Sequence, residues 1–79
     1  MRIVGDIPHP NCKITLFSWN NRYLIKVERG LLEQTYKIDQ TEIHSESELI
    51  SAISESFIQE TLLIFDQMEK SLIKAMNQP

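Results

Sequence analysis

The feature that most constrains this chain is a pair of alternating stretches separated by two asparagines. Residues 12–19 (CKITLFSW) and 22–29 (RYLIKVER) are rich in β-branched and aromatic residues, and their apolar and polar positions alternate as in strands. Asn20 and Asn21 lie between them, and asparagine tolerates the positive φ angles that both central positions of a type I′ turn require. The sequence therefore predicts an antiparallel hairpin closed by a two-residue turn.

A two-residue turn also fixes which residues of the two strands lie opposite each other. Lys13 then faces Glu28 across the hairpin, and Phe17 faces Leu24. In this register one face carries only residues that suit a core, namely Cys12, Ile14, Leu16, Tyr23, Ile25 and Val27. The other face is mixed and suits solvent. A slip of one residue would scramble both faces, so the pattern supports this register.

A third strand is predicted after a turn at Gly30, because residues 32–38 (LEQTYKI) alternate again. Its inward residues are Leu32, Tyr36 and Ile38, and its outward residues are Glu33, Thr35 and Lys37. Residues 2–6 suit a further strand at the sheet edge, because Pro8 and Pro10 would interrupt any ladder after it. The sheet is therefore expected to be an antiparallel meander of three strands, or four with the N-terminus.

The hydrophobic period changes after Asp39. Ser45 and Glu48 fit a capping box, in which the serine hydroxyl accepts a hydrogen bond from the backbone at Glu48. A short apolar stripe follows, formed by Leu49, Ile50 and Ile53. Residues 54–56 (SES) then either restart the helix or continue it. A short helix is therefore expected before the main one.

A long amphipathic helix is predicted from Glu55 to Met76. Its apolar residues recur at spacings of three and four, and they are Phe57, Ile58, Leu62, Ile64, Phe65, Met68, Leu72, Ala75 and Met76. At about 1.5 Å per residue the helix is roughly 33 Å long, which exceeds what a sheet of three short strands covers. Another surface is therefore expected to cover the overhang.

Two arrangements would accommodate this overhang. A second copy of the helix is the economical cover, since most soluble oligomers are symmetric homodimers. The alternative is a monomer in which Leu63 and Ile73, on the more polar side of the helix, are singly exposed, as apolar residues often are. The homodimer is the prediction, with contacts from Leu63, Met68, Leu72, Ile73 and Met76.

Together these elements predict an α+β fold in which the meander packs on a long C-terminal helix preceded by a shorter one. Residues 1–38 form the sheet part and residues 45–77 the helical part of a single domain, residues 1–79. A chain of this length buries only about 60% of its unfolded surface, so its core is thin and would gain from dimerisation.

The charge of the chain bears on its partners. A net charge of −3 argues against a general nucleic-acid binder, because Lys and Arg dominate such binding by neutralising phosphates. Residues 1–38 hold six basic and three acidic residues, whereas residues 39–79 hold two basic and eight acidic residues. Such asymmetry either steers a partner and orients two copies, or has no role beyond chance.

The outward face of the sheet is the main candidate binding surface. It combines apolar and basic side chains, namely Phe17, Trp19, Leu24, Arg22, Lys26 and Lys37. Single-strand nucleic-acid binders stack bases on such faces, at roughly 1–3 kcal/mol per base. The simpler interpretation is a cross-strand cluster or a patch covered by a protein partner or a second copy. The acidic chain favours the simpler interpretation and leaves single-strand binding as the alternative.

A third hypothesis concerns the segment DIPHPNC. Asp6, His9 and Cys12 are the densest set of reactive side chains, and His9 with Cys12 would suit a thiol or zinc site. A structural zinc site needs four ligands, however, and the only other histidine is His44. Cys12 also falls on the core side of its strand, where a free cysteine behaves as a small hydrophobe. Neither a metal site nor a cofactor is therefore predicted.

No catalytic constellation stands out in the sequence. Its two glycines, Gly5 and Gly30, belong to no phosphate-binding motif. The single cysteine cannot form an internal disulfide, and no apolar stretch approaches the roughly 20 residues of a membrane span. The chain is therefore predicted to be cytoplasmic and non-enzymatic, a protein–protein interaction module that forms homodimers and does not bind membranes.

Overall fold

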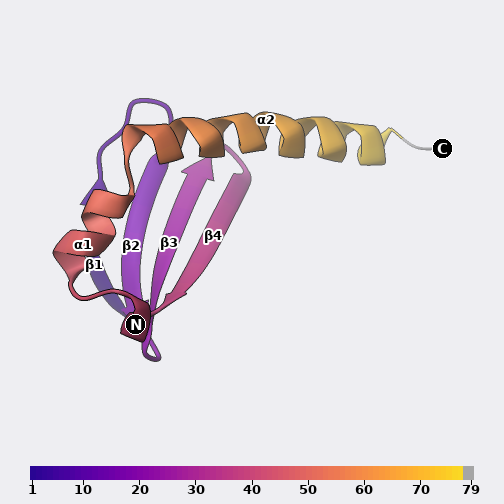
Figure 1. Ribbon diagram of the computed structural model, residues 1–79. Helices are drawn as coiled ribbons and strands as arrows, with labels where there is room; N and C mark the ends of the chain where they lie inside the picture. The colour runs from indigo at the N-terminus through magenta and orange to yellow at the C-terminus, as the bar shows by residue number, and fades with distance from the viewer. Residues whose placement is uncertain (78–79) are drawn as a thin grey trace.

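The computed structural model describes residues 1–77 and contains an antiparallel four-stranded sheet with strand order β1-β2-β3-β4 (Figure 1). Its elements are β1 (Arg2–Ile7), β2 (Lys13–Trp19), β3 (Arg22–Arg29), β4 (Leu32–Asp39), a 3-10 turn η1 (Gln40–Glu42), α1 (Glu46–Ala52) and α2 (Glu55–Met76). The predicted α+β fold is confirmed, with the four-stranded form of the sheet.

The first hairpin has the predicted register. Phe17 of β2 lies opposite Leu24 of β3, and the pairing continues without a shift along both strands. Asn20 and Asn21 have φ angles of 55° and 63°. Positive φ at both central positions is what a type I′ turn requires, so the two asparagines set the register.

The other pairings complete the meander. Gly30 and Leu31 join β3 to β4, and the positive φ of 60° at Gly30 matches the first central position of a type II′ turn. β1 pairs with β2, with a register shift between Ile3 and Gly5. The N-terminal strand is therefore part of the sheet and forms one of its edges.

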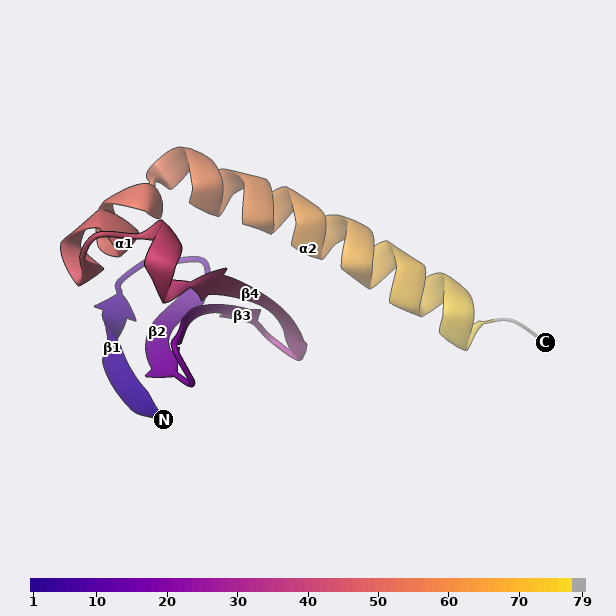
Figure 2. The ribbon, with the colours of Figure 1, turned by 60° about the horizontal axis from the view of Figure 1, so that its bottom comes forward.

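The core lies between one face of the sheet and the two α-helices, which both pack on that face (Figure 2). Its buried residues are Ile14, Leu16, Ile25 and Val27 from the sheet and Leu49, Ile53, Ile58 and Phe65 from the helices. The remaining predicted inward residues are partly buried around this cluster, and they are Cys12, Tyr23, Leu32, Tyr36 and Ile38. The predicted inward face is confirmed, whereas Thr15 and Leu24 of the predicted outward face are buried as well.

Serine caps begin both helices. The hydroxyl of Ser45 accepts a hydrogen bond from the N–H of Glu48, as the capping box predicts. Ser54 accepts one from the N–H of Phe57, so α2 starts anew and does not continue α1. Ile50 departs from its predicted role, because it is 46% exposed. A helix has 3.6 residues per turn, which points Ile50 away from the buried residue that precedes it.

A buried polar network fixes α2 over β4. The side-chain amide of Gln34 donates a hydrogen bond of 2.8 Å to the backbone carbonyl of Thr61. The hydroxyl of Tyr36 donates to the amide oxygen of Gln34, and the hydroxyl of Thr61 donates to the carbonyl of Ile58. Burying a polar group without a hydrogen bond is unfavourable, and each buried polar group of this network has a partner.

Ion pairs join the basic sheet part to the acidic helical part. Arg2 contacts Glu46 at 2.6 Å, and Arg29 contacts Asp66 at 3.0 Å. The guanidinium of Arg29 also lies 5.1 Å from the ring centroid of Phe65, in a cation–π arrangement. Part of the uneven charge distribution therefore serves contacts within the chain.

The length of α2 makes the molecule elongated. Its principal extents are 48 × 25 × 18 Å, and its radius of gyration is 14.3 Å. A compact chain of this length has a radius of gyration of about 12 Å. Although α2 is long, none of the helices in residues 1–77 is both long and apolar enough to cross a membrane.

Candidate interaction surfaces

α2 carries one apolar stripe that is buried in its first half and exposed in its second. Ile58 and Phe65 face the sheet and are buried. Leu72 and Met76 follow at helical repeats of the same face, yet they are 52% and 76% exposed. We refer to the exposed end of this stripe and its neighbours as the overhang patch, which consists of Met68, Leu72, Ile73 and Met76. The sheet that covers the first half does not cover this patch.

All predicted dimer residues except Leu63 belong to the overhang patch. Leu63 lies about two and a half helical turns before Leu72, which places it on the opposite side of α2. It is 64% exposed, similar to Leu72. Met68 differs from the rest of the patch because it is partly buried against the core. Four of the five predicted dimer residues therefore lie on one surface, and Leu63 lies on another.

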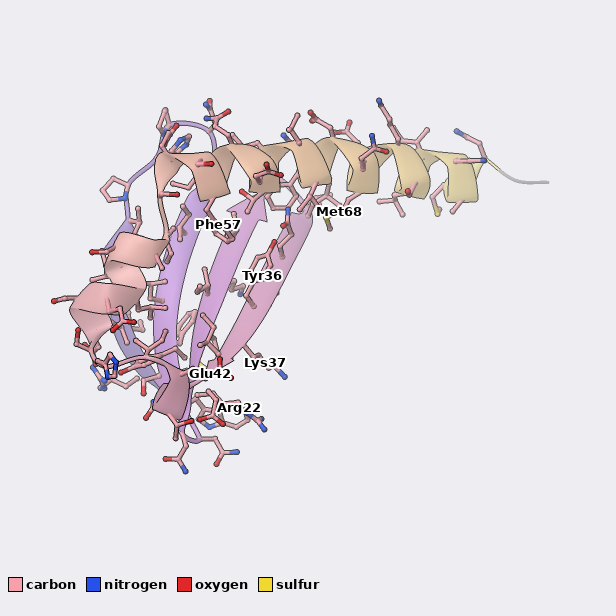
Figure 3. The ribbon with its side chains drawn as sticks, viewed as in Figure 1. Arg22, Tyr36, Lys37, Glu42, Phe57 and Met68 are labelled. Atoms are coloured by element: carbon pink, nitrogen blue, oxygen red, sulfur yellow. The ribbon has the colours of Figure 1, made fainter. Side chains whose placement is uncertain are left out.

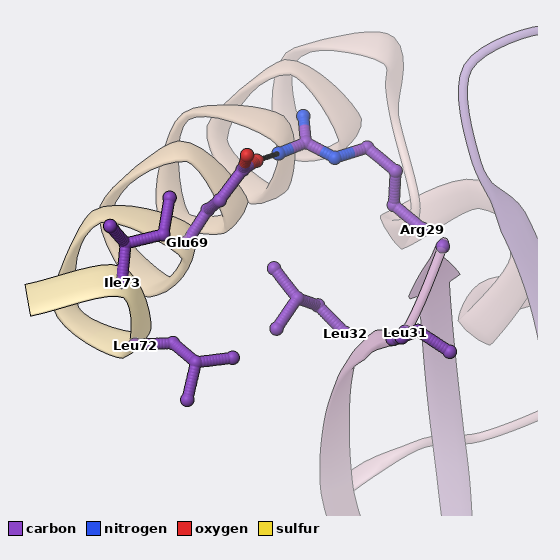
Figure 4. Close-up of a pocket in the computed structure, with 7 residues that line it drawn as sticks. Arg29, Leu31, Leu32, Glu69, Leu72 and Ile73 are labelled. Atoms are coloured by element: carbon purple, nitrogen blue, oxygen red, sulfur yellow. Dashed lines mark ion pairs between the residues drawn. The ribbon is translucent and has the colours of Figure 1, made fainter. Parts of the chain in front are cut away.

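A groove separates the overhang patch from the tip of the β3–β4 hairpin (Figure 4). Its volume is about 390 Å³, and its lining residues are Arg29, Gly30, Leu31, Leu32, Glu69, Leu72 and Ile73. Arg29 and Glu69 form an ion pair of 3.9 Å across it. Leu31, in the turn, is fully exposed. Exposed leucine and isoleucine side chains on both walls make this groove continuous with the overhang patch.

A second hollow lies on the core side of β4, beside the junction of α1 and α2. Its volume is about 530 Å³, and it is lined by Ile25, Thr35, Tyr36, Lys37, Ile38, Ala52, Ile53 and Phe57. The rings of Tyr36 and Phe57 meet edge to face, with their centroids 5.4 Å apart (Figure 3). The two α-helices therefore leave part of the core side of β4 open.

The outward sheet face bears the predicted partner-binding residues, and no element of residues 1–77 packs on it (Figure 2). Phe17 lies between Ile3 of β1 and Leu24 of β3. Trp19 is 50% exposed, and Ile3 is exposed as well. Leu24 offers little surface to a partner, because it is only 8% exposed. The accessible apolar part of this face therefore consists of Trp19, Ile3, Met1 and the half-buried Phe17.

Two predicted basic residues of this face, Arg22 and Lys26, have acidic neighbours, whereas Lys37 lies opposite Leu24. Arg22 lies directly opposite Asp39, whose pKa is lowered by hydrogen bonds from Thr41 and, to a smaller extent, by the charge of Arg22. The ammonium of Lys26 lies 3.6 Å from the carboxylate of Glu33. Because acids accompany these bases, the face is not a basic platform of the kind that polyanions require.

The structure places His9 and Cys12 in separate roles. His9 accepts a hydrogen bond from the backbone N–H of Asn11 at 3.1 Å, and its other ring nitrogen lies 3.2 Å from the carboxylate of Glu55. Burial raises the pKa of the Cys12 thiol, which disfavours the reactive thiolate. Among residues 1–77, no three His, Cys, Asp or Glu side chains gather in a way that could hold a metal ion. His9 instead links the β1–β2 loop to the start of α2.

Leu31 and Ile3 are exposed apolar residues that the sequence did not indicate. Leu31 follows Gly30 in a turn, where polar residues are usual, and this contrast was the available signal. Ile3 belongs to the edge strand, and the bulge that places it opposite Phe17 has no clear sequence signature. Both residues extend surfaces that the sequence had already indicated.

In comparisons with known proteins, the chain matches no family model, no curated protein sequence and no solved structure. The surfaces of the chain itself are therefore the basis for assigning a function.

Proposed function

We propose that this chain is a small, non-enzymatic protein–protein interaction module that forms a homodimer through its overhang patch. The outward sheet face then remains available to a protein partner. One observation carries the proposal: the face of α2 that is buried on the sheet at Ile58 and Phe65 continues, exposed, at Leu72 and Met76.

Covering the overhang patch would favour association. Burial of a Leu, Ile or Met side chain contributes about 1.5–3 kcal/mol. The second half of α2 also has little tertiary packing. Helices shorter than about 12–15 residues are only marginally stable in water without such packing. A second copy would supply both the apolar cover and the support.

The outward face suits a partner that is neither strongly acidic nor strongly basic. Its accessible apolar residues are Trp19, Ile3, Phe17 and Met1, and two of the bases beside them, Arg22 and Lys26, have acidic neighbours. Tryptophan is enriched at the centres of protein interfaces, where its large surface is desolvated. We therefore assign to this face a protein partner with an apolar centre and a polar rim.

Sedimentation equilibrium tests the homodimer. The wild type should have twice the monomer mass of 9.2 kDa at tens of micromolar. Leu72→Gln should raise the dimer dissociation constant by about tenfold or more, because one buried leucine is lost. Leu63→Gln is the matched control, since it makes the same change on the opposite side of α2. A clean monomer at high micromolar concentration would refute the proposal.

Single-strand nucleic-acid binding through the outward face is a second candidate. The half-exposed Trp19 favours it, whereas the acidic neighbours of Arg22 and Lys26 weigh against it. It predicts that oligonucleotides quench the lone tryptophan and that affinity falls steeply as salt rises. Unchanged fluorescence at low salt would remove this candidate.

A further inference from the structure

β4 is an edge of the sheet, and half of its backbone groups point away from β3. The N–H of Gln40 donates to the carbonyl of Asn21 at 3.1 Å, which makes these two residues a hydrogen-bonded pair. Such pairs alternate along an antiparallel ladder, so every second residue of β4 bonds to β3. The backbone groups of Glu33, Thr35 and Lys37 consequently point toward the open edge.

The two edges of the sheet differ in their ability to accept another strand. β1 has a register shift between Ile3 and Gly5, and Pro8 follows the strand. Bulges and prolines are devices that discourage pairing at an edge. β4 contains neither proline nor glycine, and its register with β3 is regular along its whole length. β4 is therefore the edge that can take up a further strand.

α2 projects past this same edge. It crosses the sheet near the beginning of β4, where Gln34 binds the carbonyl of Thr61, and then continues beyond β4 (Figures 1 and 2). The overhang patch continues the sheet-facing side of α2. It therefore lies above the space into which the sheet would extend if another strand joined β4.

We propose that a second copy of this chain occupies that space, with its β4 paired antiparallel to β4 around a twofold axis. This inference rests on the proposed homodimer and assigns its interface. A twofold axis makes both copies use the same surface, so one contact serves both open edges and both overhang patches. The dimer would contain one continuous sheet.

The sequence of β4 is self-complementary in one register. If Thr35 lies opposite the partner's Thr35 on the axis, Glu33 faces the partner's Lys37 on the outward side. On the core side, Leu32 then faces the partner's Ile38. Each of these pairs occurs twice because of the symmetry. Opposite charges and apolar residues meet across the strands, which is the pairing that stabilises antiparallel sheets.

Neighbouring registers lose this match. A slip of one residue in the pairing would place core-facing residues opposite outward ones. The next register in one direction puts Glu33 opposite the partner's Asp39, which is a like-charge pair. The next register in the other direction leaves Lys37 and Ile38 without a β4 residue opposite them. The charge pairs and the inward or outward orientation of the side chains therefore favour the register centred on Thr35.

This register also covers the overhang patch. Antiparallel pairing brings the end of the partner's β4 beside the beginning of β4, which is where α2 crosses the edge. In each chain Tyr23 and Ile38 pair at that end and are only partly buried on the core side. The overhang patch would lie over the partner's Tyr23 and Ile38, so each copy would complete the core of the other.

Sedimentation equilibrium of four variants tests the pairing, with circular dichroism as the check of folding. Thr35→Pro removes an N–H that points away from β3, so it should spare the hairpin and raise the dimer dissociation constant at least a hundredfold. Lys37→Glu should raise it about tenfold by facing Glu33 of the partner subunit. Glu33→Lys combined with Lys37→Glu should restore it. Lys13→Glu makes the same charge change away from the edge and is the control.

The outcomes separate this inference from the homodimer itself. If the wild type is a dimer and neither Thr35→Pro nor Lys37→Glu weakens it, while Leu72→Gln does, the β4 pairing is wrong and the homodimer stands. If the wild type is a monomer, both proposals fail. Should Thr35→Pro unfold, the charge reversal at Lys37 and its rescue by Glu33→Lys decide the matter alone.

Discussion

The two halves of α2 present the same hydrophobic pattern in opposite situations. From Glu55 to Phe65 the apolar stripe packs on the sheet, and Gln34 fixes the helix through the carbonyl of Thr61. From Asp66 to Met76 the same face of the helix is largely exposed. The helix itself is regular throughout. The difference lies in the layer beneath it, because the sheet ends at β4.

A hydrophobic stripe therefore marks a face to be buried without specifying what buries it. The first half of α2 is covered by its own chain, so its contacts set the stability of the monomer. In the second half only Met68 is partly buried by residues 1–77, and the remaining apolar side chains are exposed and available for association. Substitutions in the two halves should therefore affect different quantities.

The largest expected effect is that of Phe65→Ala. Phe65 is fully buried, so its truncation leaves a cavity and should lower the free energy of unfolding by about 3–5 kcal/mol. Leu72→Ala, one stripe position further along, should cost the dilute monomer less than about 1 kcal/mol. Urea unfolding at low protein concentration measures both. Equal losses would contradict the distinction between the two halves.

Gln34→Ala should have the next largest effect, because it removes the anchor that only the first half possesses. The carbonyl of Thr61 and the hydroxyl of Tyr36 would each lose a buried partner, at a total cost of about 1–3 kcal/mol. Gln67→Ala makes the same change on the exposed side of α2 and should stay within about 0.5 kcal/mol of the wild type. The same urea titrations apply, and a neutral Gln34→Ala would show that the network does not hold α2.

Ser54→Ala tests the beginning of the supported half. The lost N-cap hydrogen bond to the N–H of Phe57 should cost about 1 kcal/mol and lower the melting temperature by roughly 4–8 °C. Ser71→Ala, an exposed serine in the unsupported half, is the matched control and should leave the melting temperature nearly unchanged. Thermal unfolding followed by circular dichroism distinguishes the two variants. Equal shifts in melting temperature would show that the Ser54 cap does not stabilise the protein.

The smallest effect concerns pH. Hydrogen bonds from Gln59 and then His9 lower the pKa of the Glu55 carboxyl. A carboxyl whose pKa is depressed by folding adds stability above its unfolded pKa and loses it as the pH falls through the folded value. The difference in unfolding free energy between wild type and Glu55→Gln should therefore be present at about pH 7 and shrink as the pH falls below the ordinary carboxyl pKa. If the difference in unfolding free energy grew on acidification, folding would raise the pKa of Glu55 and not lower it.

The local parts of the fold were predictable from sequence. Asn20 and Asn21 determine the first hairpin through their own φ angles, and Ser45 caps α1 through a residue three positions later. Such interactions depend on neighbours in the chain, so the sequence displays them directly. The bounds of α2, Glu55–Met76, follow from its periodicity in the same way.

The non-local parts were not predictable. The burial of Leu24 depends on which residues of neighbouring strands lie beside it. The hydrogen bond from Gln34 to Thr61 joins β4 to α2 and has no local signal. Leu63 was predicted on the more polar side of the helix and still counted among the dimer contacts with Leu72, although helical geometry places the two on opposite sides. The candidate surfaces could therefore be indicated by the sequence but not delimited by it.

Amide hydrogen exchange at two protein concentrations tests whether a second copy buries the second half of α2. If a second copy covers the overhang, protection from Asp66 to Met76 should rise with concentration, whereas protection from Glu55 to Phe65 should stay constant, since the sheet of the same chain covers that half. Exchange of the second half that is independent of concentration up to high micromolar would contradict the claim that another copy buries it.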